Sequence, residues 1–282
     1  MAVRIITDSI ADLPSGIVEE LGITVVPLII NYEGRDYRDG VDLSASEIYE
    51  RLKTSPAMPK TSIPPPSAFL QAYEKLAAET GEILVISLSS RLSGTYEEAR
   101  QCAVAFRNRV RIEVLDSRTA TIAEGFVVLK AARAAKAGAS LSQVIRVAQE
   151  AIPRTALLAS FDTLKYLQRG GRIGAAKVLL GSLLQINPLI TLRDGLVAPA
   201  GRVRSRAKAM SALLEFAQSF ASIEELAVGH GACPEDAEAL IERLGAVFPK
   251  ERIWRSNTTP VIGAHTGPGL LLVSALGDRK EN

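Results

Sequence analysis

Short apolar runs alternate with stretches of helical periodicity through the first half of the chain. Continuous apolar runs of this length are typical of strands buried on both faces, and they occur at residues 3–7, 23–30, 83–88 and 110–116. Apolar residues at helical spacing lie between or after them, at residues 12–21, 44–55, 67–80, 95–106, 119–137 and 139–152. Strands that alternate with helices predict a mostly parallel sheet with helices on both faces.

The second half of the chain shows a different order of elements. Strands are predicted at residues 154–161, 189–191, 196–198, 225–229, 252–256 and 270–275, and helices at 163–168, 175–186, 205–220 and 234–248. These elements predict an α/β domain whose sheet is antiparallel or mixed, with helices on one side. We place the domain boundary at Pro153, which gives an N-terminal α/β domain of residues 1–153 and a C-terminal α/β domain of residues 154–282.

Turn residues add detail to both halves. Glu33-Gly34, in the polar segment 31–42, predicts a surface loop or hairpin, and Asp194-Gly195 is a strong hairpin signal. Ser44 and Glu47 have the spacing of a capping box at the start of a helix.

Composition excludes several classes of protein. The 282 residues are 47% hydrophobic and 23% charged, which is ordinary for a globular protein, and a net charge of +2 argues against a dedicated nucleic-acid binder. No helix-turn-helix or basic stripe is recognisable, and no Walker A loop is present. Two distant cysteines, Cys102 and Cys233, and two histidines lack the spacing of metal ligands. We therefore expect no nucleic-acid partner, no bound metal and no cofactor.

The N-terminus and the lengths of the apolar runs indicate where in the cell the protein is located. The chain enters a strand at once, so we expect no signal peptide, and no window approaches the roughly 18 consecutive apolar residues of a membrane span. We expect a cytoplasmic protein without stable membrane insertion, which leaves room for transient contact with a membrane surface.

The loop after the strand at 83–88 is the first candidate site. It reads Ser89-Ser-Arg-Leu-Ser-Gly-Thr95, and Thr95-x-x-Glu98 has the spacing of a capping box at the start of the next helix. A polar loop between a buried strand and a helix N-terminus presents free amide donors to an anion. The local pattern fits a simple helix cap equally well, so the choice between a cap and a binding site depends on other segments of the chain.

Two further polar segments supply comparable side chains: residues 60–67 and residues 260–270. Together with the first loop they offer six candidates, none of which is a lysine or arginine: Thr61, Ser62, Ser93, Thr95, His265 and Thr266. Such a set can hold one carboxylate through several hydrogen bonds, and an unpaired charge beside an apolar surface would be strongly penalised.

Five motifs in this order resemble those of the DegV-like proteins, the group that contains the fatty-acid-binding subunits (FakB) of bacterial fatty acid kinase. They span nearly the whole chain: Thr7-Asp-Ser9, Thr61-Ser62 before a proline run, Ser89-Ser-Arg-Leu-Ser-Gly-Thr95, Leu167-x-Arg-Gly-Gly-Arg-Ile173 and Gly263-x-His-Thr-Gly-Pro-Gly269. Each motif alone is weak evidence for the resemblance, whereas all five in this order are specific for this family.

The resemblance implies a lipid-binding protein of phospholipid metabolism that is not itself an enzyme. A long-chain fatty acid would lie in a crevice between the domains, with the polar loops of the N-terminal domain at its head and the C-terminal domain covering its acyl chain. Its carboxylate would be held by Thr61, Ser93, His265 and Thr266. A separate, ATP-binding fatty acid kinase would phosphorylate this carboxylate to an acyl phosphate.

Arg172 is the candidate for contact with that partner. It closes the segment Leu167-Gln-Arg-Gly-Gly-Arg172, which fits a helix end with solvated charges or an arginine that faces the kinase or the transferred phosphate. The looser basic run at residues 202–208 favours a solvated flank.

An enzyme in its own right is the alternative hypothesis. Ser93 could serve as the nucleophile and His265 as the base of an acyl hydrolase, or His265 could carry phosphate. The Ser93 loop is not a Gly-x-Ser-x-Gly elbow, and no acid is clearly placed to orient His265. The carrier is the favoured interpretation; the apolar residues that would line its tunnel, in the strand at 83–88 and in segments 161–167 and 178–186, cannot be ranked.

Overall fold

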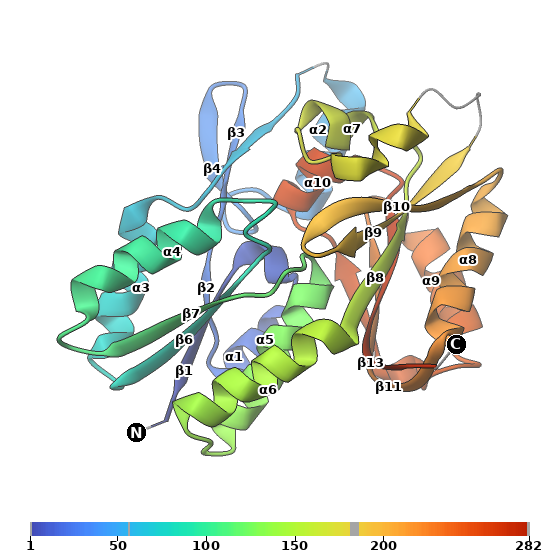
Figure 1. Ribbon diagram of the computed structural model, residues 1–282. Coiled ribbons are helices and arrows are strands. Elements are labelled where there is room, and N and C mark those ends of the chain that lie inside the picture. Colours follow the sequence, from blue (N-terminus) through green and yellow to red (C-terminus); the bar gives the residue numbers. More distant parts are fainter. Residues whose placement is uncertain (1, 56, 181–185, 281–282) are drawn as a thin grey trace.

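Two sheets of different construction organise the protein (Figure 1). The computed structural model describes residues 2–55, 57–180 and 186–280. The sequence predicted a mostly parallel first sheet, and this sheet is parallel throughout, with strand order β2-β1-β6-β7. Its strands are β1 (Arg4–Asp8), β2 (Thr24–Val26), β6 (Glu82–Ser87) and β7 (Arg111–Asp116).

Alternate residues of β1 and β6 are buried on opposite faces of this sheet, which explains their continuous apolar runs. Ile6 and Val85 pack in one core cluster with Phe69 and Ala99, from helices α3 (Pro66–Ala77) and α4 (Thr95–Ala103). The intervening residues, Leu84 among them, pack in a second cluster with α5 (Ile122–Lys136) and α6 (Leu141–Arg154). Helices therefore cover both faces, as predicted.

The second sheet is mixed, with strand order β10-β9-β8-β13-β11-β12. Only β11 and β12 pair in parallel among its described strands. Its strands are β8 (Thr155–Ser160), β9 (Asn187–Arg193), β10 (Leu196–Val203), β11 (Phe220–His230), β12 (Ile253–Asn257) and β13 (Leu271–Arg279). The predicted hairpin joins β9 to β10 through Asp194 (φ 49°) and Gly195 (φ 78°).

The two faces of the second sheet have different neighbours. Leu158 and Val273 pack with α8 (Arg206–Gln218) and α9 (Pro234–Leu244). Leu157, Ala159 and Leu272 instead join the core cluster that also holds α5. The inner face of the second sheet therefore packs toward the first domain.

The predicted single strand at 23–30 is wrong. β2 ends at Val26, and a new strand, β3 (Ile29–Tyr32), begins after Pro27, which has no amide hydrogen for a strand ladder. β3 belongs to a small antiparallel sheet of order β4-β3-β5, with β4 (Arg35–Arg38) and β5 (Lys60–Ser62). The predicted turn at Glu33-Gly34 joins β3 to β4, with positive φ at both residues.

Of the two capping boxes that the sequence predicted, one is formed and the other is not. The capping box at Ser44 is formed and begins α2 (Ala45–Thr54), whereas the one predicted at Thr95 is not, because Gly94 is the N-cap and Thr95 already lies in α4. Of the predicted helix at 175–186, the described part is a 3₁₀ helix (Gly174–Leu179), and residues 181–185 lie outside the described residues.

The remaining helices are short. They are α1 (Ser15–Leu21), α7 (Lys165–Arg169), α10 (Pro260–Thr266) and the 3₁₀ turns Ser9–Ala11, Val104–Phe106 and Lys250–Arg252. The sequence pattern did not predict α10. Among the described residues, none of the helices combines the length and the apolar character that a membrane span requires.

Candidate functional site

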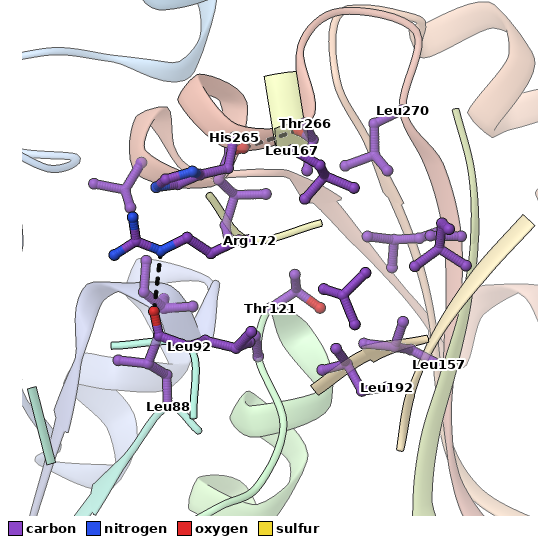
Figure 2. A pocket seen from close by; sticks show the side chains of 18 of the residues that line it. Leu88, Leu92, Thr121, Leu157, Leu167, Arg172, Leu192, His265, Thr266 and Leu270 are labelled. Atoms are coloured by element: carbon purple, nitrogen blue, oxygen red, sulfur yellow. Dashed lines mark hydrogen bonds between the residues drawn. The ribbon is translucent and has the colours of Figure 1, made fainter. Parts of the chain in front are cut away.

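A cavity lies between the two sheets and is lined mostly by apolar side chains (Figure 2). It encloses about 830 Å³ of space free of protein atoms, part of which is open to solvent. The first domain contributes residues from the ends of its strands, and the second domain contributes the inner face of its sheet, including Leu157, Ile190, Leu192 and Leu272. The cavity therefore depends on both domains.

Side chains from distant segments form a polar group in the wall of this cavity. Thr61 lies on β5, Ser93 follows β6, Arg172 follows α7, and His265 and Thr266 lie on α10. The hydroxyl of Thr61 is 2.8 Å from Nε2 of His265, across 204 residues of sequence. Four of the six hydroxyl and imidazole candidates from the sequence thus line one cavity.

The other two candidates lie outside the cavity lining. Ser62 is exposed, because neighbouring residues of a strand point to opposite faces. Thr95 is buried beneath the loop, where its hydroxyl lies 2.9 Å from the hydroxyl of Ser93 and its amide donates to Ser93 Oγ at 3.4 Å. Thr95 therefore supports Ser93 instead of facing the cavity.

The partly buried ring of His265 is uncharged at neutral pH. Removal of the ring from water, and next the charge of Arg172, lower the pKa of His265 to about 4. Its Nδ1 has no hydrogen-bond partner among the described residues. Gly170 lies directly against this atom, since a Cβ at that position would be 2.3 Å from Nδ1. The first glycine of the pair in the arginine motif, Gly170, therefore leaves space for the imidazole.

Arg172 lies in the cavity wall, although the sequence analysis assigned it to contact with a partner. Its Nη1 donates to the carbonyl oxygen of Gly170 at 2.7 Å, and its Nε donates to the carbonyl oxygen of Leu92 at 3.1 Å. The guanidinium thus joins the Ser93 loop to the segment that packs on His265. The polar side chains in the cavity wall therefore include one positive charge, that of Arg172, whereas none of the six hydroxyl and imidazole candidates from the sequence is a lysine or arginine.

The hydroxyl of Thr266 already has an acceptor. It donates to the carbonyl oxygen of Ile262 at 2.9 Å, one turn earlier in α10. In this arrangement Thr266 offers lone pairs to the cavity, whereas donation to a carboxylate requires its hydroxyl to rotate.

Two aspartates of the first domain hold the start of α10. Thr259 N donates to Asp12 Oδ1 and Val261 N donates to Asp39 Oδ1, both at 2.9 Å. These contacts satisfy amides at the helix start that have no partner within the helix. Asp39 also accepts from Ser9 Oγ at 2.6 Å, and burial raises the pKa of this carboxyl to about 6. One residue in the sequence could have predicted the start of α10: Pro260, because proline is favoured at the first position of a helix.

Thr121 is a cavity residue that the sequence analysis missed. It precedes α5 with φ 61°, a conformation that is rare for a β-branched residue and costs about 1–3 kcal/mol. Its hydroxyl is buried and has no hydrogen-bond partner among the described residues. The predicted helix at 119–137 included Thr121, whereas α5 begins at Ile122.

The fold and the site together define a two-domain α/β protein with an apolar cavity at the domain interface and a small polar group in its wall. Residues 2–278 match the family described as "Uncharacterised protein, DegV family". The chain belongs to the DegV family.

The similarity to known relatives extends over nearly the whole chain. A DegV domain-containing protein of Deinococcus radiodurans is 37% identical over 280 residues, which are 97% of this chain and 98% of the relative. A solved structure of a DegV family protein from Thermus thermophilus, described by its fatty acid binding, has a TM-score of 0.90 at 32% identity and covers 98% of this chain and 100% of its own. The crystal structure of DegV from Bacillus subtilis, described as a fatty acid binding protein, has a TM-score of 0.89 at 30% identity and covers 98% and 99%.

Proposed function

We propose that this protein binds a long-chain fatty acid in the cavity between its domains and presents the carboxylate to a separate fatty acid kinase. The observation that carries the proposal is an apolar cavity with a few hydroxyl, imidazole and guanidinium groups in its wall. Such a site suits a ligand with one small polar end and a long apolar tail.

The tail supplies most of the binding free energy in this proposal. A chain with about 14 methylenes gains at most roughly 11 kcal/mol on burial, at about 0.8 kcal/mol for each. Association itself costs about 4–15 kcal/mol, so the polar group has to offset desolvation of the carboxylate and set its orientation. Leucine side chains around the cavity, such as Leu157, Leu192 and Leu270, provide the apolar surface.

We assign the carboxylate to the side of the cavity with Thr61, Ser93, His265 and Thr266. The hydroxyls of Thr61 and Ser93 can donate to a carboxylate, and the charge of Arg172 favours an anion nearby. A carboxylate beside His265 also favours the protonated ring, so we expect ligand binding to raise the pKa of His265 from about 4.

Phosphorylation by a separate kinase rests on the resemblance of the motifs. In this proposal the second protein binds ATP and supplies the phosphate, and the carrier, whose sequence contains no Walker A loop, holds the acceptor carboxylate. Arg172 could contact the transferred phosphate, since its planar guanidinium suits phosphate geometry.

The hydrogen bonds favour binding over hydrolysis by Ser93 and His265. A nucleophile and its base lie within hydrogen-bond reach of each other. In this protein His265 Nε2 instead contacts Thr61, and the hydroxyl of Ser93 contacts Thr95. These partners suit a group of side chains that surrounds a carboxylate.

Native mass spectrometry of the purified protein tests the proposal. We expect a long-chain fatty acid bound in a 1:1 ratio, or uptake of added palmitate or oleate by protein stripped of lipid. Acyl phosphate should form only when the cognate kinase and ATP are added. Absence of both co-purified lipid and uptake contradicts the binding proposal, and turnover without any kinase contradicts the carrier role.

A further inference from the structure

The hydroxyl of Thr121 is a polar group on the part of the cavity wall assigned to the acyl chain. Figure 2 shows its oxygen turned toward the side of the cavity with Leu157 and Leu192, whereas His265 and Arg172 lie across the cavity. The residue is 8% exposed and its hydroxyl lacks a hydrogen-bond partner among the described residues. A saturated acyl chain would bury this hydroxyl without giving it a partner.

Local structure does not account for a threonine at this position. With φ 61° and ψ −159° the backbone favours glycine, and the hydroxyl makes no cap bond to α5. Valine has nearly the same shape without a hydroxyl, and it would satisfy an apolar wall better. A water molecule needs two to four polar partners, and the side chains of Leu157 and Leu192, on the side toward which the Thr121 hydroxyl is turned in Figure 2, supply none.

We propose that Thr121 makes the cavity selective for fatty acids with an oxygen substituent, a hydroxyl or keto group, along the chain. This inference rests on the proposed binding of a fatty acid with its carboxylate at Thr61 and His265. The threonine hydroxyl can donate to a keto oxygen, and it can donate to or accept from an alcohol. The fixed carboxylate then determines which chain position places its oxygen at Thr121.

The pairing of two buried polar groups produces this selectivity. An unsubstituted chain leaves the Thr121 hydroxyl unpaired, and a substituent at another position adds a second unpaired group in an apolar wall. A substituent at the matching position pairs both groups. Affinity should therefore peak at one position, instead of rising or falling steadily along the chain.

The test compares binding of stearate and of a set of hydroxystearates that differ in the position of the hydroxyl group. Wild-type protein should bind one positional isomer about tenfold more tightly than the other isomers, and at least as tightly as stearate. Thr121→Val, which keeps the β-branched shape, should lose the positional preference and bind stearate at least as tightly as wild-type protein does, because the unpaired hydroxyl is gone. Thr121→Gly also lacks the hydroxyl and suits a positive φ, so it should lose the preference as well and tests the inference if the valine variant does not fold.

Thr61→Val is the matched control at the carboxylate. It should weaken stearate and every hydroxystearate by a similar factor and leave their order unchanged. Equal affinity of wild-type protein for all isomers, or an unchanged preference in Thr121→Val, overturns the inference about Thr121. Failure of wild-type protein to bind stearate or any isomer is a different result, because it overturns the proposed function itself.

Discussion

His265 is positioned by direct contact with a glycine backbone. Its Nε2 contacts Thr61 at 2.8 Å, and its Nδ1 lies where a side chain on Gly170 would begin. Gly170 has φ −74°, so the backbone itself would accept alanine. A Cβ at this position would meet the imidazole first, at 2.3 Å, and next the carbonyl oxygen of Tyr166 at 3.2 Å.

We expect Gly170→Ala to displace His265 and weaken fatty acid binding. The new Cβ would lie 2.3 Å from Nδ1, so the ring has to move away from Thr61. Overpacking of this kind typically costs about 1–3 kcal/mol of stability. Urea unfolding and titration with a fluorescent fatty acid measure the two effects.

Gly16→Ala is the control for this substitution. A Cβ at Gly16 meets no atom within 4 Å, and the residue lies in α1, so alanine should be neutral or slightly stabilising. Wild-type affinity and stability in Gly170→Ala would contradict the contact between Gly170 and His265.

At the scale of elements, α10 connects the two domains at the site. It follows β12 of the second sheet, yet its first amides donate to Asp12 and Asp39 of the first domain. Figure 1 shows α10 and α7 together at the upper edge, between the two sheets. The position of His265 and Thr266 therefore depends on carboxylates far away in the sequence.

Asp12→Gly should loosen α10, whereas Asp12→Asn should not. Asp12 has φ 52°, which glycine and asparagine both tolerate, so the two variants differ mainly in the acceptor for Thr259 N. Burial raises the pKa of Asp12 well above its usual value, which favours the uncharged carboxyl, and loss of a hydrogen bond between uncharged groups costs about 0.5–1.5 kcal/mol. We expect faster amide exchange in α10 and weaker fatty acid binding in Asp12→Gly alone. Equal exchange in both variants would show that Asp12 does not hold this helix.

At the scale of the whole molecule, buried acids near the carboxyl end of β1 make stability dependent on pH. Burial raises the pKa of Asp8 and of Asp39 to about 6 each, and burial and next the charge of Asp8 raise the pKa of Glu124 well above its usual value of 4.5. The unfolded chain releases these protons at lower pH than the folded protein. Stability from this source is complete below about pH 4 and is lost as pH rises through the folded pKa values.

The histidines act in the opposite direction. Burial lowers the pKa of His230 and of His265, so the unfolded chain binds protons more readily and stability falls as pH drops below about 6.5. The effect of the buried acids on stability therefore has to be separated from that of the histidines, which a substitution at one acid can do.

Glu124→Gln should stabilise the protein more at pH 8 than at pH 4.5. Glutamine does not ionise, so the loss of stability that Glu124 causes at high pH disappears. The contact with Thr7 (3.3 Å) can persist, because the glutamine oxygen also accepts a hydrogen bond. The measurement is the free energy of unfolding in urea for both proteins at both pH values. A difference between the proteins that does not change with pH would contradict a raised pKa for Glu124.

Local patterns in the sequence determined the fold class and much of the element order. Strands such as β1 and β6 are buried on both faces, which requires continuous apolar runs, and the Asp194-Gly195 turn requires residues that tolerate positive φ. These properties depend on neighbours in the chain. The prediction failed where short-range patterns compete: Pro27 divides one apolar run between two sheets, and Gly94 replaces Thr95 as the cap of α4.

The sequence also determined which loops carry hydroxyl groups, and the structure brings Thr61, Ser93, His265 and Thr266 to one cavity. Only the tertiary structure decided how they meet, because the contact between Thr61 and His265 spans 204 residues and α10 is held by the other domain. Burial, which depends on the packing of both domains, keeps His265 neutral and leaves the hydroxyl of Thr121 without a partner in the part of the chain that the structure describes. No local pattern encodes these effects, since each arises from atoms that the chain brings together only when both sheets have packed.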